Sequence, residues 1–232
     1  MPHRPRTLLA TVAGALVACG LAVGVAVARG GDDWSGPHVA PTASGVLAAD
    51  FVRPTGTPSP EATITPAPGS WDAVRPSGPL RVVLLTTDDD GPTAAVAAAV
   101  RDWAGDEDVS LRTVVSRDAA DRLPAALRAI DLHPDLVISA GEALVDPLAQ
   151  VTPSHLDQEF LVVGAELAEP TANVTAADWS GASFRGEGLG ASSAYDASSF
   201  TPERCGAAVR AGVASVLSGL TGIVVWLDDA PA

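Results

Sequence analysis

The stretch "LRVVLLTTDDDGPTAAVAAAV", residues 80–100, decides the fold class of this chain. Its first eight residues, 80–87, form an almost unbroken apolar run rich in β-branched side chains, which predicts a strand buried on both faces. After three aspartates and Gly91-Pro92 the apolar residues follow helical spacing, so we expect a helix over 92–104. A strand, an acidic loop and a helix in this order indicate the first unit of a parallel sheet.

The same alternation continues to the end of the chain. We expect further strands over 109–116, 135–141, 159–167, 173–179 and 221–227, and further helices over 118–130, 142–151 and 201–220. Continuous apolar strands that alternate with helices predict an α/β fold, with an open and mostly parallel sheet covered by helices on both faces. The sequence therefore predicts one domain over 79–232.

The segment ahead of this domain, residues 29–78, has a different composition. It is rich in Pro, Gly, Ser, Thr and Ala and holds eight prolines. Such a segment buries too little apolar surface to offset the entropy lost on ordering, so we expect an extended tether. Two apolar islands, "SGVLAADFV" (44–52) and "SWDAV" (70–74), are the places where the tether could dock on the domain.

The N-terminal residues 1–28 contain a candidate membrane segment. Residues 8–28 are small or apolar, and 21 residues of helix span roughly 30 Å, the thickness of a bilayer core. Arginines precede the run and aspartates follow it, which favours a cytoplasmic N-terminus. A signal-anchor, a lipoprotein signal acylated at Cys19 and a cleaved signal peptide all stay open. Each of them predicts that the remainder is extracytoplasmic, and the first two predict a membrane-anchored protein.

The charge balance and the cysteines exclude several classes of function. The chain has 28 acidic and 14 basic residues, for a net charge of −14, and every basic side chain is an arginine. An acidic surface without a basic cluster argues against a nucleic-acid partner. Cys19 lies in the membrane segment and Cys205 in a predicted helix, so we expect no disulfide framework and a buried structural thiol at Cys205. We expect no cofactor and no metal.

Several polar residues are expected to share one edge of the sheet. In open parallel sheets ligands bind at the carboxyl ends of the strands. The candidate ligand-binding rim consists of Thr87, Asp88, Asp89, Asp90, Ser139, Gly141, Glu142 and Glu166. A small molecule is the ligand that such a rim favours.

The three aspartates at 88–90 are open to three interpretations. They can stabilise a helix N-terminus, or accept hydrogen bonds from ligand hydroxyl or amine groups. "DDDGPT" also resembles the motif of haloacid-dehalogenase-type phosphatases, and "LLTTDDDG" with "HPDLVISAG" resembles survival-protein-E nucleotidases, both metal-dependent. However, Pro92 interrupts the first motif, the chain has no lysine, and residues 140–152 lack the asparagine of the second family. We therefore expect no catalysis.

A longer resemblance covers Leu80 to Leu227. Its pieces are "HPDLVISAGEALVDPLAQV" (133–151), "QEFLVVGAEL" (158–167), "NVTAADWSGASFRGEG" (173–188) and "GAAVRAGVASVLSGLTGIVVWL" (206–227). Their order resembles the first lobe of the basic-membrane-protein (PnrA-like) family of substrate-binding lipoproteins that serve ABC transporters. The chain departs from the family at Thr93-Ala94-Ala95, where members have a serine-aromatic-asparagine signature.

This resemblance implies a single lobe of a type I periplasmic-binding fold and ligands such as nucleosides. An ABC permease is the partner that it implies. Because a two-lobed binder closes on its ligand, one lobe would offer half of the contacts, and a partner could supply the second. The sequence leaves other functions open: a sensing role, a metal-dependent phosphatase or nucleotidase that uses Asp88 to Asp90, and a structural module of the cell envelope without a ligand.

Overall fold

The computed structural model describes residues 34–52, 56–87, 90–107, 109–182, 184–191 and 193–228. The chain separates into two compact units, Met1–Gly30 and Gly31–Ala232, and the described residues belong to the second. The predicted membrane segment, including Cys19, and the rim residues Asp88 and Asp89 lie outside the described residues. Within the described ranges, no helix has both the length and the apolar character needed to span a bilayer.

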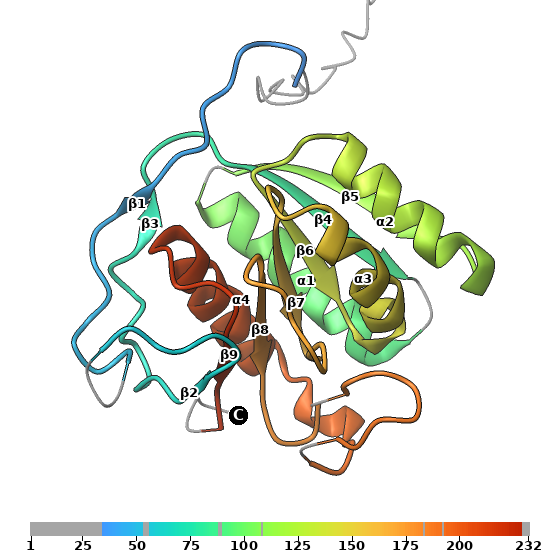
Figure 1. The fold of residues 1–232 in the computed structure, drawn as a ribbon. Coiled ribbons are helices and arrows are strands. Elements are labelled where there is room, and N and C mark those ends of the chain that lie inside the picture. Colours follow the sequence, from blue (N-terminus) through green and yellow to red (C-terminus); the bar gives the residue numbers. More distant parts are fainter. Residues whose placement is uncertain are drawn as a thin grey trace, which may run out of the picture. The chain divides into compact units, whose positions relative to one another are not determined.

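The centre of the domain is a seven-stranded sheet in the order β2-β9-β8-β7-β6-β4-β5, and its strand pairs are parallel throughout the described residues (Figure 1). Its strands are β2 (Thr63–Ile64), β4 (Arg81–Thr87), β5 (Ser110–Ser116), β6 (Leu136–Ala140), β7 (Glu159–Val163), β8 (Val174–Asp178) and β9 (Val224–Trp226). This arrangement confirms the predicted α/β fold class.

Helices cover both faces of the sheet, as Figure 1 shows. Helices α1 (Gly91–Asp106) and α4 (Pro202–Leu217) pack on one face, and α2 (Arg122–Asp131) and α3 (Val145–Val151) pack on the other. Because neighbouring side chains of a strand point to opposite faces, a strand buried on both sides has to be apolar throughout. The run at 82–85, each residue 0% exposed, meets this demand.

The predicted elements are present, with shorter bounds at several ends. The helix expected over 118–130 is a 3₁₀ turn, η1 (Ala119–Asp121), followed by α2, and the helix expected over 142–151 is η2 (Glu142–Leu144) followed by α3. Two further 3₁₀ turns are η3 (Thr152–Ser154) and η4 (Ala197–Ser199). Such differences arise at element ends, where apolar periodicity carries little information.

The segment ahead of β4 is folded onto the domain and is not the extended tether that its composition predicted. Phe51, Trp71 and Val74 are 1%, 5% and 6% exposed and belong to the core on the α1 and α4 face. In addition, β2 lies alongside β9 as the last strand of the sheet, and β1 (Ala43–Ser44) pairs with β3 (Arg75–Pro76). Both apolar islands therefore dock, because a few large side chains are enough to hold a segment of otherwise small residues.

The strand order reverses direction at the pair formed by β4 and β6. From β4 the chain passes through α1 to β5 at one edge, and then through α2 to β6 on the other side of β4. From β6 it proceeds outward to β7, β8 and β9. The carboxyl ends of β4 and β6 therefore form the topological switch point, where open parallel sheets bind their ligands.

Candidate functional site

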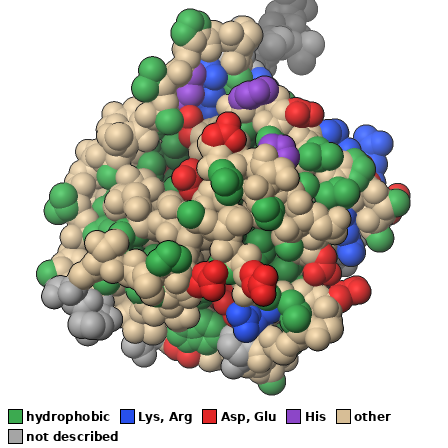
Figure 2. Space-filling model, in the orientation of Figure 1, with side chains coloured by type: hydrophobic (Ala, Val, Ile, Leu, Met, Phe, Trp, Pro, Cys, Tyr) green, Lys and Arg blue, Asp and Glu red, His purple; other side chains and the backbone are tan. Residues whose placement is uncertain are grey.

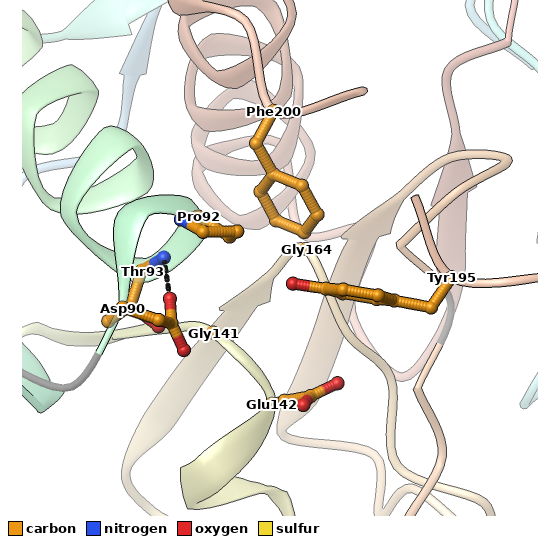
Figure 3. A pocket seen from close by; sticks show the side chains of 8 residues that line it. All are labelled: Asp90, Pro92, Thr93, Gly141, Glu142, Gly164, Tyr195 and Phe200. Atoms are coloured by element: carbon orange, nitrogen blue, oxygen red, sulfur yellow. Dashed lines mark hydrogen bonds between the residues drawn. The ribbon is translucent and has the colours of Figure 1, made fainter. Parts of the chain in front are cut away.

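A shallow pocket lies at this switch point (Figure 3). It has about 190 Å³ of space, which includes the part open to solvent. Its lining residues come from the loops that follow β4, β6, β7 and β8: Asp90, Pro92, Thr93, Gly141, Glu142, Gly164, Tyr195 and Phe200. The pocket is thus built by segments that are far apart in the sequence and that the parallel sheet brings to one edge.

Asp90 lies where the loop after β4 enters α1. Its extended backbone and its side chain form the N-cap of the helix, and its Oδ1 accepts a hydrogen bond of 2.6 Å from the Thr93 amide. Pro92 occupies the first turn, where no amide proton is required. At this position the helix-terminal interpretation of the acidic loop is correct, and the same carboxylate also lines the pocket.

Two glycines allow the elements around the pocket to approach each other. Gly141 follows β6 with a φ of +83°, and a Cβ atom there would collide with the Thr93 side chain. Gly164 follows β7 with a φ of +75°, and its Cβ would lie 2.7 Å from the Phe200 ring. Glycine is therefore required at both positions for two reasons. L side chains rarely adopt positive φ, and there is no space for a Cβ atom. Gly141 also sets the direction in which Glu142 leaves the strand.

The charge inside the pocket is negative. Burial raises the pKa of the Glu142 carboxyl, and the neighbouring Asp90 charge raises it further. Within the described part of the chain the Glu142 carboxylate has neither a hydrogen-bond partner nor an ion-pair partner, and only its carbonyl is bonded, to the Val145 amide. Burial also raises the pKa of the Tyr195 phenol, and the charges of Glu142 and Asp90 add to the effect. A bound group that donates hydrogen bonds would be stabilised here, whereas an anion would be repelled.

Figure 2 shows several acidic side chains in the lower part of this face of the molecule. In Figure 1 the loops after β7 and β8 leave the sheet in this part of the view. None of the eight residues that line the pocket is an arginine. The lining of the pocket thus contributes two carboxylates and no cation.

The structure separates the predicted rim residues into four groups, of which Glu166 alone forms the last. Asp90, Gly141 and Glu142 line the pocket. Thr87 and Ser139 are 4% and 1% exposed, and their positions in β4 and β6 alternate with those of the α1 and α4 face, so their side chains project to the opposite face. Asp88 and Asp89 lie outside the described residues.

Glu166, the remaining residue of the predicted rim, does not line the pocket. It is 7% exposed and forms an ion pair of 3.2 Å with Arg185, while its amide donates to the Phe184 carbonyl. These contacts tie the loop after β7 to the segment that follows β8. The Glu166 carboxylate thus has a partner within the chain, whereas that of Glu142 has none among the described residues.

Sequence reasoning missed Tyr195 and Phe200, which form the aromatic part of the pocket. They lie in a Gly- and Ser-rich loop that has no apolar periodicity. The one available signal was composition, because Tyr195 is the single tyrosine of the chain and Phe200 precedes the cap of a helix. A loop-borne aromatic residue is a candidate for ligand contact.

Metal and thiol chemistry find no support in the described residues. No group of three or more His, Cys, Asp or Glu side chains in the described ranges is placed to hold a metal ion. Cys205 is 0% exposed within α4, and burial raises the pKa of its thiol to about 12. This confirms the expectation of a buried structural cysteine, because a thiol in that environment stays protonated.

No family model matches the sequence, and no curated protein matches it. Among solved structures, an ABC transporter solute-binding protein from Aeropyrum pernix K1 is similar, with 20% identity, coverage of 44% of this chain and 29% of that one, and a TM-score of 0.39. A fragment assigned as a lipoprotein, from Peptoclostridium difficile 630, has 15% identity, coverage of 59% and 98%, and a TM-score of 0.43.

An ABC transporter solute-binding protein from Bradyrhizobium sp. BTAi1 has 13% identity, coverage of 84% of this chain and 61% of that one, and a TM-score of 0.34. The chain spans less than two thirds of the length of both solute-binding proteins. These likenesses are weak, and the fold class rests on the parallel sheet itself.

Proposed function

We propose that this chain is an extracytoplasmic solute-binding domain that takes a small polar ligand at the pocket. The observation that carries the proposal is the position of the pocket at the switch point between β4 and β6. Two carboxylates from different strand ends, Asp90 and Glu142, converge there. Concave sites with a few convergent polar groups at such a point are the usual ligand sites of open α/β sheets.

The chemistry of the pocket restricts the ligand. Carboxylates accept hydrogen bonds, and the Glu142 carboxylate receives none from the described residues, so the ligand is expected to supply hydroxyl or amine donors. A phosphate or carboxylate on the ligand would meet two like charges, which costs several kcal/mol. The resemblance to the basic-membrane-protein family supports a nucleoside as the specific ligand, since a nucleoside offers donors without an anionic group.

The setting follows from the same resemblance and from the N-terminal residues. We infer that residues 8–28 anchor the domain to the membrane, either as a signal-anchor or through a lipid on Cys19. An ABC permease, or a partner that covers the open side of the pocket, would then complete the binding unit. Replacing Cys19→Ala distinguishes the two anchors, because only a lipoprotein would lose the mass of its lipid, while protease added outside intact cells should reach the domain in both cases.

The experiment that tests the function is calorimetric titration of the full-length chain in a mild detergent. Adenosine is the first probe, and adenosine monophosphate is the matched anionic compound. We expect adenosine monophosphate to bind more weakly than adenosine by roughly tenfold or more. Glu142→Gln should weaken adenosine binding, because the amide is a poorer acceptor and also presents a donor. Glu169→Gln is the matched control, since Glu169 is exposed and does not line the pocket.

Two other outcomes would replace the proposal. Hydrolysis of adenosine monophosphate with Mg²⁺ or Mn²⁺ that disappears when Asp88, Asp89 and Asp90 are changed to Asn would favour a metal-dependent phosphohydrolase. Absence of binding for nucleosides, small amines and polyols alike would favour a structural module of the cell envelope.

A further inference from the structure

A row of three aromatic side chains leads from the core to the pocket. Trp179 is 0% exposed and Phe200 8% exposed, and their rings meet edge to face with centroids 5.0 Å apart. The Tyr195 ring follows at 6.1 Å from Phe200 and is 52% exposed. Two members of the row are thus fixed by burial, and the third presents half of its surface where the pocket opens.

Hydrogen bonds hold the chain on both sides of Tyr195. The amide of Gly181 donates to Ser193 Oγ at 2.8 Å, and the amide of Asp196 donates to the Gly181 carbonyl at 2.7 Å. The Asp196 carboxylate in turn accepts from the Ser198 amide at 2.9 Å and caps η4. Tyr195 therefore lies in a loop that is held on both sides by hydrogen bonds to Gly181, at Ser193 and at Asp196.

The orientation of the phenol adds to this arrangement. Figure 3 shows the Tyr195 hydroxyl pointing across the pocket toward Asp90 and Thr93, with Glu142 beside the ring. The raised pKa of Tyr195, caused first by burial and then by these two carboxylates, agrees with that placement. A group bound between Asp90 and Glu142 would have to lie against the face or the edge of this ring.

We propose that Tyr195 is a ligand-contact residue that determines the specificity of the pocket, a proposal that rests on the proposed function. Its ring forms the outer wall, so a ligand held by the Asp90 and Glu142 carboxylates is covered by aromatic surface instead of water. Tyrosine is suited to this task, because it offers a large and rigid apolar surface at a small cost in conformational entropy. The preferred ligand then carries an apolar part next to its hydrogen-bond donors.

The single tyrosine gives this proposal a direct readout. Full-length chain labelled with 3-fluorotyrosine shows one fluorine resonance, which we expect to shift on titration with adenosine, with the dissociation constant that calorimetry gives. Tyr195→Ala should weaken adenosine binding about tenfold, whereas Tyr195→Phe, which keeps the ring, should stay within about threefold of the wild type. Leu189→Ala is the control, since Leu189 is 56% exposed and does not line the pocket.

The possible results separate the two proposals. Calorimetric binding of adenosine without movement of the resonance, or wild-type affinity in Tyr195→Ala, would show that Tyr195 is no contact residue and would leave the proposed function standing. If the wild type binds no nucleoside, amine or polyol, the proposed function fails and the role of Tyr195 fails with it. If Tyr195→Ala unfolds at the same denaturant concentration as the wild type, any loss of affinity is not caused by a loss of stability.

Discussion

Two irregular regions of the domain have similar compositions and opposite environments. The described part of the segment at 34–78 and the segment at 180–200 are both rich in small and turn-forming residues, and both have few regular elements. The first places Phe51 and Trp71 in the core, at 1% and 5% exposure, whereas the second buries Phe200 at 8% but presents Tyr195 at 52%. Composition alone therefore does not decide whether such a segment is structural or is available for binding. The role of such a segment depends on whether its few large side chains are buried or exposed.

The polar contacts at the two edges of the sheet also differ. At the amino edge of the sheet, His38 Nε2 lies 2.7 Å from the Asp135 carboxylate, which also accepts from the Arg81 amide at 2.7 Å. The Trp34 ring lies under the Arg112 guanidinium at 4.4 Å. At the carboxyl edge, the Glu142 carboxylate faces the pocket without such a partner in the described residues. Paired groups hold the fold together, and groups without a protein partner are the ones a ligand can use.

The largest effect is expected from Phe51→Ala. Loss of a fully buried aromatic side chain should lower the free energy of unfolding by about 3–5 kcal/mol. Urea unfolding measures this change, and Val46→Ala, at a position that is 78% exposed, should stay within about 0.5 kcal/mol of the wild type. Equal stability of both variants would mean that the segment ahead of β4 is a tether after all.

A smaller loss is expected from Asp135→Ala at the amino edge. The change leaves the Arg81 amide and the His38 imidazole without their acceptor, which should cost about 1–3 kcal/mol. Asp131→Ala is the matched control, because Asp131 is exposed. If both variants unfold at the wild-type urea concentration, the contacts at this edge do not hold the segment in place.

Asp90→Ala should have a comparable but smaller effect, about 0.5–2 kcal/mol, because it removes the N-cap of α1. Asp102→Ala, in the same helix and exposed, removes no cap and serves as its control. Thermal unfolding compares the two. The cap variant should also lose affinity for adenosine, since Asp90 lines the pocket, and an unchanged affinity would assign Asp90 to the helix alone.

The smallest effect on stability is expected at the pocket wall. Tyr195→Ala should change the free energy of unfolding by less than about 0.5 kcal/mol. The phenol itself should titrate above its ordinary pKa of 10.0, because burial and the charges of Glu142 and Asp90 favour the protonated form. Phenolate absorbance follows this single group. Glu142→Gln should move the midpoint back toward 10.0, and an unchanged midpoint would mean that the carboxylate does not face the ring.

The sequence predicted an element or a site residue correctly where a short stretch of residues had one clear structural role. The apolar run at 80–87, rich in β-branched residues, predicted the strand buried on both faces, and the acidic loop before Pro92 contained the cap that α1 required. Gly141 and Glu142 were placed on the rim because they follow an apolar strand. The carboxyl ends of parallel strands meet at one edge, so these predictions needed no tertiary detail.

Other residues could not be placed without the assembled sheet. Thr87 and Ser139 belong to strands that are apolar on both faces, so the sequence contains no sign of which face each side chain takes. Tyr195 reaches the pocket because Gly181 joins the two ends of its loop through hydrogen bonds to Ser193 and Asp196. Contacts of this kind depend on the geometry of the folded loop and leave no periodic pattern.

The central claim is that the carboxyl edge at the switch point binds the ligand. Amide resonances of the isotopically labelled full-length chain in detergent test it most directly, because every loop around the pocket contributes an amide. On addition of adenosine, the account predicts saturable shifts concentrated at Thr93, Gly141 and Gly164, with those of Arg81 and Asp135 at the opposite edge unchanged. Shifts centred on the amino edge, or none at saturating adenosine, would contradict it.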